Sequence, residues 1–406
     1  MKHFIYKGLG FELFLELEGK KAHVTAQGPL SRLARPICEG FNTYASLEKV
    51  TAVRGNDVVI SSLIPPAPSG PFNRLIKAQI NNRLFGKYTP ESLMILTTSK
   101  CQCTCQHCIA FGIRGDPELS TEELCNAIDQ SIELGTYNVS FEGGEPTLRK
   151  DIFDLISHID KNKATSHLIT NGFLLTQAYV KKLKEAGLDY LHLSLDSPYP
   201  NIHDKFRGIN GIFEKVASDV KYAVEEGLVV IIEYTAAPGN SDIKALNDLY
   251  QYCSSIGVQE ILIDEVVPAG RWAYRENDVL KEEDRARLVK FQNEANELEG
   301  SRVCGSLILR DPKIIGCFAG RKWMWLSPTG EVMPCFHVPI SFGNTRNQSM
   351  KDIWKAMRKH PLFKKAPKNC AWADPYYKQH YFKKIQDSIN EKNLPYPISK
   401  LDGRKD

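Results

Sequence analysis

The sequence has no run of about 18 apolar residues, so no segment is predicted to cross a membrane. Its first residues contain a lysine but lack the apolar stretch and small-residue cleavage site of a secretion signal. Long disordered tracts are not expected either, because 42% of the 406 residues are hydrophobic and are spread along the chain. These absences predict a cytoplasmic protein, and the length of 406 residues predicts two or three domains.

The chain also lacks a strong charge of either sign. Its 52 Lys and Arg outnumber 48 Asp and Glu by only four, so a nucleic acid is not expected as partner. The surplus lies after residue 350, where residues 351–406 carry 14 Lys or Arg and 6 Asp or Glu with aromatic residues between them. This basic segment is either an ordinary solvated surface or a face for an acidic peptide, a nucleic acid or a lipid headgroup.

Cysteine, in contrast, is abundant. Eleven cysteines in a chain without a secretion signal are expected to persist as thiols or metal ligands rather than as disulfides. A local group of them therefore predicts a metal site first.

The residues predict three successive regions. Residues 1–71 have the pattern of short strands followed by a proline-rich linker, with a hairpin expected from Phe11–Leu17 and Ala22–Ala26. Residues 72–273 begin with an amphipathic helix at 72–85 and continue as alternating apolar runs and helical segments. Residues 274–406 form the third region and contain the C-terminal cysteines.

The middle region has the pattern of a parallel α/β fold. Its helical segments often end at a glycine, which takes a left-handed conformation at little cost, and the first opens with a capping box at Ser120–Glu123. Six β/α units in about 170 residues predict a partial (β/α)6 barrel, with ligands at the carboxyl ends of the strands. The six apolar runs are Leu93–Leu96, Tyr137–Phe141, His167–Ile169, Tyr190–Leu195, Val229–Tyr234 and Ile261–Ile263.

A cysteine-rich loop follows the first of these runs. Cys101, Cys105 and Cys108 have the spacing CxxxCxxC, which lets one loop supply three thiolates to an iron-sulfur cluster and leaves the fourth iron open. Zinc is the weaker alternative, because a zinc site favours paired CxxC knuckles with a fourth ligand nearby. Cys103 lies outside the triad and is not assigned to it.

With this loop the chain resembles a radical S-adenosylmethionine (SAM) enzyme, a superfamily that carries such a loop after the first strand of a partial (β/α)6 barrel. Glu142–Pro146 is similar to the family's GGEP element, and Thr170–Gly172 to a common element beside the cofactor. Ser194–Ser197 and His203–Gly208 are similar to the SLDG and HDxxRG elements. Four such elements at successive strand ends are not expected by coincidence.

The resemblance implies the cofactors and the residues around them. The three cysteines would hold a 4Fe-4S cluster, and SAM would complete the coordination of its open iron. One-electron cleavage of SAM then gives a 5'-deoxyadenosyl radical that removes a hydrogen atom from substrate, and no side chain is assigned as a catalytic base. The implied SAM contacts are Gly143, Gly144, Glu145 and Pro146 at the amino group, Asn171 beside the cofactor, Ser194 and Asp196 near the ribose, Arg207 near the carboxylate, and His107 near the adenine in place of the family's usual Tyr or Phe.

The C-terminal region contains a second cysteine pattern. Cys317 and Cys335 belong to a CX12GX4C pattern, and a hairpin at Thr329–Gly330 would bring their thiols together. Cys370 follows alone, without the CX2CX5CX3C run of a second auxiliary cluster. This pattern resembles a SPASM domain or its shortened twitch form, and it implies one auxiliary 4Fe-4S cluster on Cys317, Cys335 and Cys370; the alternative is three buried thiols in a hairpin domain. The fourth ligand stays open among Cys304, His337, water and substrate.

Three functions follow from these patterns. The first is a maturase that modifies a peptide or protein, since SPASM and twitch domains are frequent in such enzymes and an auxiliary cluster can accept an electron from substrate. The second is a tailoring enzyme for a small molecule, tetrapyrrole, cofactor or lipid, placed at a membrane surface by the helix at 72–85. The third is an iron-sulfur electron carrier, against which the SAM-binding elements argue. A flavodoxin or ferredoxin is the expected electron donor for either enzyme.

Overall fold

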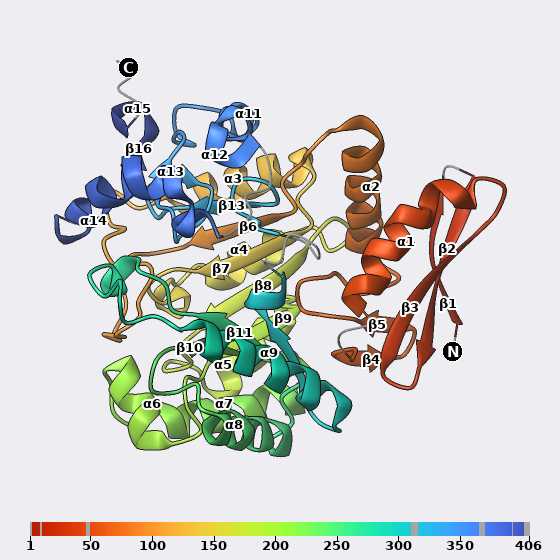
Figure 1. Ribbon diagram of the computed structural model, residues 1–406, viewed down its shortest axis with the longest axis horizontal. Coiled ribbons are helices and arrows are strands. Elements are labelled where there is room, and N and C mark those ends of the chain that lie inside the picture. Colours follow the sequence, from red (N-terminus) through yellow and green to blue (C-terminus); the bar gives the residue numbers. More distant parts are fainter. Residues whose placement is uncertain are drawn as a thin grey trace.

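A nine-stranded sheet forms the centre of the protein (Figure 1). The computed structural model describes residues 2–8, 10–45, 49–309, 316–364, 370–391 and 393–401. The strand order is β12-β11-β10-β9-β8-β7-β6-β13-β14, and the six strands from β6 to β11 run parallel in sequence order. These six strands are β6 (Ser92–Leu96), β7 (Asn138–Glu142), β8 (Thr165–Thr170), β9 (Tyr190–Ser194), β10 (Val229–Ala236) and β11 (Glu260–Glu265).

Helices connect the six strands, which confirms the predicted (β/α)6 series. The capping box predicted at the start of the first helix is present, with Ser120 accepting from the amide of Glu123. The predicted terminal glycines Gly135, Gly187, Gly227 and Gly257 all have positive φ. The connecting helices are α3 (Thr121–Leu134), α4 (Ile152–His158), α5 (Gln177–Glu185), α6 (Pro200–Arg207), α7 (Ile212–Glu225) and α8 (Ile243–Ser255).

The sheet extends beyond the six predicted strands at both edges. After α9 (Glu282–Glu297), strand β12 (Arg302–Gly305) pairs in parallel with β11. At the other edge β13 (Trp323–Leu326) pairs in parallel with β6 and forms a hairpin with β14 (Val332–Met333). The domain boundary expected after residue 273 stays a prediction, but the sheet continues past it.

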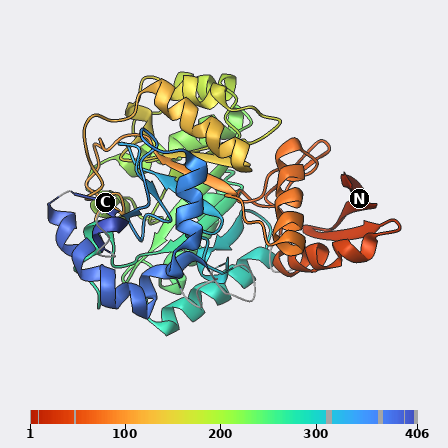
Figure 2. The ribbon, with the colours of Figure 1, turned by 90° about the horizontal axis from the view of Figure 1, so that it is seen from above.

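The N-terminal region is a three-stranded antiparallel sheet followed by a helix. Strand β1 (Lys2–Gly8) adds to the predicted hairpin of β2 (Phe11–Glu18) and β3 (Lys21–Gln27). Helix α1 (Ser31–Ala45) is absent from the sequence prediction, because Pro36 lies inside it and interrupts the helical pattern. Figures 1 and 2 show this region to one side of the barrel.

Helix α2 (Gly70–Phe85) confirms the predicted amphipathic helix and shows where its apolar side goes. Phe72, Leu75, Ile76 and Ile80 are buried in the apolar cluster of the N-terminal region. Most of this side of the helix is therefore covered by protein, whereas Leu84 and Phe85 at its end are exposed. None of the helices in the described residues is both long and apolar enough to cross a membrane.

The C-terminal region packs short elements against the edge of the sheet. The basic segment predicted from charge belongs to this region, and its residues 365–369, 392 and 402–406 lie outside the described ones.

The remaining strands and α-helices come from both ends of the chain. They are β4 (Ala52–Arg54), β5 (Asp57–Val59), α10 (Ser306–Leu309), β15 (Ile340–Ser341), β16 (Tyr396–Pro397), α11 (Met350–Lys359), α12 (Pro361–Lys364), α13 (Pro375–Tyr377), α14 (Lys383–Asn390) and α15 (Ile398–Leu401).

The N-terminal region also closes the amino end of the barrel. Val59 packs with Tyr190 and Val229, the first residues of β9 and β10, in one buried cluster. The carboxylate of Glu260, the first residue of β11, accepts hydrogen bonds from the hydroxyl groups of Thr51 (2.5 Å) and Ser62 (2.5 Å). With this end filled, only the carboxyl ends of the strands remain for a ligand.

Candidate functional site

The loop that carries the three predicted cluster cysteines follows β6 at the carboxyl end of the barrel. Cys101 is exposed, Cys108 is half-buried and Cys105 is buried. The loop contains little regular structure of its own, so its shape depends on the segments that hold it.

The first of these segments is the double glycine after β7. The amides of Gly144 and Glu145 donate to the carbonyl groups of Thr98 (2.7 Å) and Lys100 (2.8 Å). A Cβ on Gly144 would lie 2.1 Å from the carbonyl oxygen of Lys100, and one on Gly143 would lie 2.8 Å from that of Thr98. The glycines are therefore needed because the backbone of the cysteine loop lies against them, a reason distinct from close approach to a ligand.

The second segment is the end of α6 and the third is the loop after β11. The carbonyl groups of Arg207 and Phe206 accept from the amides of Thr104 (3.1 Å) and Gln106 (3.0 Å). On the other side the amide of Arg271 donates to the carbonyl of Cys108 (2.9 Å), where a Cβ on Gly270 would lie only 2.3 Å away. These three segments thus fix both halves of the loop.

Glu145 links two strand ends rather than pointing freely into a pocket. Its buried carboxylate accepts from the amide and hydroxyl of Thr147 (3.1 and 2.5 Å), the hydroxyl of Thr170 (2.6 Å) and the amide of Asn171 (2.9 Å). Burial raises the pKa of Glu145, and these four donors oppose that shift. Three of these donors reach Oε1 and one reaches Oε2, so Oε2 and the nearby backbone carbonyls can still accept from an ammonium group.

Two polar side chains from neighbouring strand ends reach the cysteine sulfurs. Arg207 donates through Nε to Asp196 (2.5 Å), and its Nη1 lies 3.8 Å from Sγ of Cys105. Asn171 Nδ2 lies 3.9 Å from Sγ of Cys101. Burial alone would raise the pKa of Asp196, but the Arg207 guanidinium holds it below its usual range.

The electrostatics of the loop favour thiolate at two of the three predicted ligands. A hydrogen bond from the Cys103 thiol is the main cause that lowers the pKa of Cys101 and that of Cys105, and the Arg207 charge helps to bring that of Cys105 to about 6. Burial raises the pKa of Cys108 to about 11. Cys103, unassigned from the sequence, is thus a hydrogen-bond donor to its neighbours, since its amide also lies 3.4 Å from Sγ of Cys101.

The remaining predicted SAM contacts lie around this loop. His107 stacks on Phe206, with ring centroids 4.5 Å apart, and burial lowers its pKa to about 4, so the ring is neutral. Ser194 is buried at the end of β9, and Pro146 is buried after the double glycine. His203 accepts the Asp196 amide through Nδ1 (3.0 Å), which leaves its buried Nε2 without a partner in the structure.

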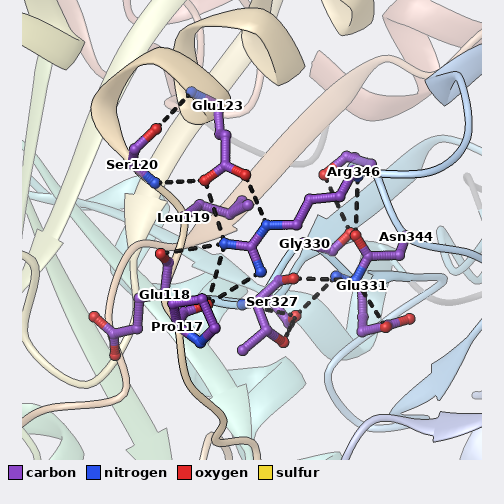
Figure 3. A network of polar contacts seen from close by, with 12 residues as sticks. Pro117, Glu118, Leu119, Ser120, Glu123, Ser327, Gly330, Glu331, Asn344 and Arg346 are labelled. Carbon is purple, nitrogen blue, oxygen red and sulfur yellow. Dashed lines mark hydrogen bonds and ion pairs between the residues drawn. The ribbon is translucent and has the colours of Figure 1, made fainter.

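A polar network joins residues 117–123, which follow the cysteine loop, to the C-terminal region (Figure 3). Glu118 accepts from the amide and hydroxyl of Ser99 (both 2.8 Å), two residues before Cys101. Arg346 reaches from the C-terminal region to the carboxylate of Glu123 (2.7 Å) and to the carbonyl groups of Pro117 (3.1 Å) and Glu118 (3.3 Å). Neither Glu118 nor Arg346 belongs to a recognisable motif, so the sequence did not reveal them.

The C-terminal cysteines lie on loops that contact one another. Cys317 and Cys335 are buried, and the amide of Gly320 donates to the carbonyl of Pro334 (3.1 Å), which joins their two loops. Cys335 and Cys370 both lie close enough to Tyr377 to add to the raised pKa of its phenol, whose main cause is burial. Among the candidate fourth ligands, His337 donates its amide to Sγ of Cys335 (3.4 Å), whereas Cys304 is fully buried on β12.

The donor chemistry of the loop with Cys101, Cys105 and Cys108 fits an iron-sulfur cluster, and at the C-terminal cysteines an amide donates to Sγ of Cys335. Thiolate-forming cysteines, amide donors to sulfur and a buried arginine are the environment that such clusters use. Within the part of the chain that the structure describes, no three Cys, His, Asp or Glu side chains are already arranged as a metal-binding set.

The lumen of the barrel contains polar groups that the sequence analysis did not assign. Glu142, His192 and Glu233 occupy the inward side of β7, β9 and β10, which the strand register identifies. His192 Nδ1 lies 2.6 Å from Oε1 of Glu233. Their signal in the sequence is a charged or imidazole residue inside an apolar strand, as in Leu191–Leu193 and Ile232–Tyr234.

Together these features define a class: an α/β-barrel protein with a three-cysteine iron-sulfur loop at the carboxyl ends of its strands and a second cysteine site in a C-terminal domain. Comparison with family models agrees. Residues 95–250 match the radical SAM superfamily, and residues 317–375 match SPASM, the iron-sulfur cluster-binding domain. The chain therefore contains a radical SAM domain followed by a SPASM domain. The superfamily uses a 4Fe-4S cluster and SAM, and the SPASM domain implies auxiliary iron-sulfur clusters.

Individual relatives act on different substrates. The chain is 27% identical over 284 residues to the AdoMet-dependent heme synthase of Oleidesulfovibrio alaskensis, covering 64% of this chain and 72% of that protein. It is 26% identical over 291 residues to the PqqA peptide cyclase of Granulibacter bethesdensis, covering 68% and 76%. Streptococcus suis SuiB bound to its precursor peptide SuiA shares the fold, with a TM-score of 0.58, 16% identity and 90% of each chain covered.

Proposed function

We propose that this protein is a radical SAM enzyme that modifies a peptide, with Cys101, Cys105 and Cys108 holding the catalytic cluster. When bound, the cluster and SAM supply a 5'-deoxyadenosyl radical, which removes a hydrogen atom from the substrate. The single observation that carries the radical SAM assignment to these residues is the contact of Arg207 with both Asp196 and Cys105, because it joins a predicted SAM element to a predicted ligand.

The residues of the chain bind and orient the cofactors. Arg207 provides a buried positive charge beside the cluster, which suits the carboxylate of SAM. The backbone carbonyls of the Gly143–Gly144 segment suit its ammonium group, while Glu145 holds that segment and Asn171 in place. His107 offers a neutral ring face for the adenine, and Ser194 and Asp196 lie at the end of β9 for the ribose.

The auxiliary site is assigned to Cys317, Cys335 and Cys370. Its role is to accept the electron that the substrate loses after hydrogen abstraction. The position of this second cluster domain against the edge of the barrel suits that role. Strand β13 of this domain pairs directly with β6, the strand that leads into the cysteine loop. The backbone thus holds the two cysteine sites in a fixed relation.

The charge of the lumen favours a peptide over a tetrapyrrole with several carboxylates. Among the described strand residues that face the lumen, Arg302 is the single Lys or Arg, and it is paired with Glu260 (2.9 Å) at the amino end. A substrate with many carboxylates would therefore enter a lumen that offers no countercharge beyond this pair. Peptide-cyclase relatives support the peptide, and heme-synthase relatives support the second candidate.

The experiment uses reconstituted enzyme, dithionite and SAM with two probes. Where a short reading frame flanks the gene, the peptide it encodes is the first probe, and the second is iron coproporphyrin. A peptide mass loss with matching 5'-deoxyadenosine supports the proposal. Turnover of the porphyrin alone would replace it with the tetrapyrrole function, and no 5'-deoxyadenosine with either probe would contradict both.

A further inference from the structure

A continuous chain of side-chain contacts crosses the lumen beneath the cysteine loop. It begins at the carbonyl of Leu63, in the linker that closes the barrel, and passes through Asn138 on β7 (3.2 Å) to Thr165 on β8 (2.6 Å). It continues through His167 (3.2 Å) and His192 (3.1 Å) to Glu233 on β10 (2.6 Å). The chain joins four neighbouring strands, so its donors and acceptors depend on one another.

The direction of the first bonds is fixed at the Leu63 end. A carbonyl only accepts, so Asn138 donates to it through Nδ2 and its Oδ1 must accept the hydroxyl proton of Thr165. Thr165 has no second proton, so Nε2 of His167 must donate to the Thr165 oxygen. Burial holds the pKa of His167 well below its usual value, so the ring is neutral and Nδ1 must accept.

The last bonds then follow. His192 donates through Nε2 to Nδ1 of His167, and the short contact between His192 Nδ1 and Glu233 Oε1 must itself contain a proton. Whether this proton sits on the ring or on the carboxyl, the His192–Glu233 pair has no net charge. The carboxyl group of Glu233 therefore adds no net negative charge to the lumen, because the hydrogen-bond network supplies the proton that it shares with His192.

Glu142 faces this pair from β7. Its carboxyl group makes no side-chain hydrogen bond within the described residues, although it is more than half buried. Burial, with a smaller contribution from Glu233, raises the pKa of Glu142 to about 8. The carboxyl is consequently protonated at neutral pH and carries an O–H with no acceptor inside the protein.

We propose that Glu142 is a neutral hydrogen-bond donor for a carbonyl oxygen of the substrate, with the His192–Glu233 pair keeping the lumen uncharged around it. This proposal rests on the proposed function and narrows its ligand to an amide or other neutral carbonyl group, such as a peptide bond. It also gives Glu142 the opposite role to that of a general base, which would need the ionised form.

The groups that face Glu142 agree with this role. His167, His192 and Glu233 form the neutral network on β8, β9 and β10, and Asp264 on β11 accepts from Ser306 (2.7 Å). Glu145, three residues along, is held by its own four donors. Within the described lumen no lysine or arginine is near enough to ionise Glu142, so its protonation depends on burial.

Infrared spectroscopy of the reconstituted enzyme tests the protonation directly. We expect a protonated-carboxyl band at pH 6.5 that disappears with a midpoint near pH 8 and is missing from Glu142→Gln. The matched control is Glu122→Gln, on the exposed first turn of α3, which should leave the band unchanged. Absence of the band from the wild-type protein would overturn the proposal.

Turnover of the synthetic peptide separates a donor from a base. Glu142→Gln keeps an N–H donor, so it should retain at least about a third of the wild-type rate and should not show the fall in rate above pH 8. Glu142→Leu has no donor and should lose about tenfold or more in rate, which corresponds to one lost hydrogen bond of about 1.4 kcal/mol. If Gln is as inactive as Leu, Glu142 is a base and the proposal is wrong. If the wild-type enzyme makes no 5'-deoxyadenosine, the proposed function is wrong, and so is the proposed hydrogen bond from Glu142 to a substrate carbonyl. The infrared result still reports the protonation state of Glu142 in that case.

Discussion

The guanidinium Nη1 of Arg207 lies 3.8 Å from Sγ of Cys105, although 102 residues separate them in the chain. The same guanidinium is bonded to the buried carboxylate of Asp196 at the end of β9. One arginine therefore connects a strand end that the sequence assigns to SAM with a cysteine that it assigns to the cluster. A change in the charge of Arg207 would therefore affect both Asp196 and Cys105.

Removing this arginine should raise the pKa of Cys105. The hydrogen bond from Cys103 and the Arg207 charge together bring that pKa to about 6, so Arg207→Gln should move it up by about one unit or more. The measurement is the pH dependence of alkylation of Cys105 in cluster-free protein, followed by mass spectrometry. Lys205→Gln, exposed on the same helix, is the matched control and should leave the midpoint in place. An unchanged midpoint in Arg207→Gln would show that the contact has no electrostatic effect.

A side chain at Gly144 should disrupt the cysteine loop. The Cβ of Gly144→Ala would lie 2.1 Å from the carbonyl oxygen of Lys100, so the two backbones must separate at a cost of about 3 kcal/mol. We expect a lower thermal midpoint and poor cluster incorporation, measured as iron per chain after reconstitution. Gly40→Ala is the control, because its Cβ would meet only the flexible end of Arg83. Equal iron content in the two variants would contradict this role for Gly144.

Arg346 should stabilise the junction between the cysteine loop and the C-terminal region in a pH-dependent way. Its hydrogen bond is the main cause that lowers the pKa of Glu123 to about 2, so the ionised form is favoured in the folded state. A lowered carboxyl pKa gives stability that is complete above about pH 5 and is lost as the pH falls toward 2. Arg346→Gln should lower the thermal midpoint by about 2 °C at pH 7, and the difference should shrink below pH 5. Lys355→Gln is the control; a difference that does not depend on pH would exclude the Glu123 pair as its source.

The auxiliary site should account for about half of the iron. Two 4Fe-4S clusters give about eight iron atoms per chain, and a Cys317→Ala/Cys335→Ala variant should fall to about four while keeping the catalytic cluster. Iron and sulfide analysis with electron paramagnetic resonance of the reduced protein distinguishes the two clusters. Cys253→Ala, a fully buried thiol on α8, controls for loss of a core cysteine. Iron content that stays near eight would remove the assignment of these two cysteines.

The sequence predicts the barrel well because its signals are local. Each strand is a short apolar run followed by a loop motif, and terminal glycines such as Gly135 mark the helix ends. Helix α1 escapes prediction because Pro36 lies inside it, and β13 because it belongs to the sheet through pairing with β6, which is distant in the sequence. Local signals therefore describe the units but not how far the sheet extends.

The site divides in the same way. The three cysteines and the strand-end elements are recognisable by their spacing. The role of Glu145 is not, because its four donors belong to Thr147, Thr170 and Asn171, which the fold brings together. The neutral His192–Glu233 pair depends on a bond network that starts at Leu63, more than a hundred residues earlier. Such roles need the tertiary structure, since no local pattern specifies which group donates and which accepts.

The most direct test of the account is the cleavage of SAM by anaerobically reconstituted protein with dithionite. We predict 5'-deoxyadenosine from the wild-type protein and from Cys125→Ala, whose thiol lies on helix α3 away from the loop, and none from Cys105→Ala. No product from wild-type protein with a full complement of iron, or product from Cys105→Ala equal to that of the wild type, would contradict the assignment of this loop as a radical SAM site.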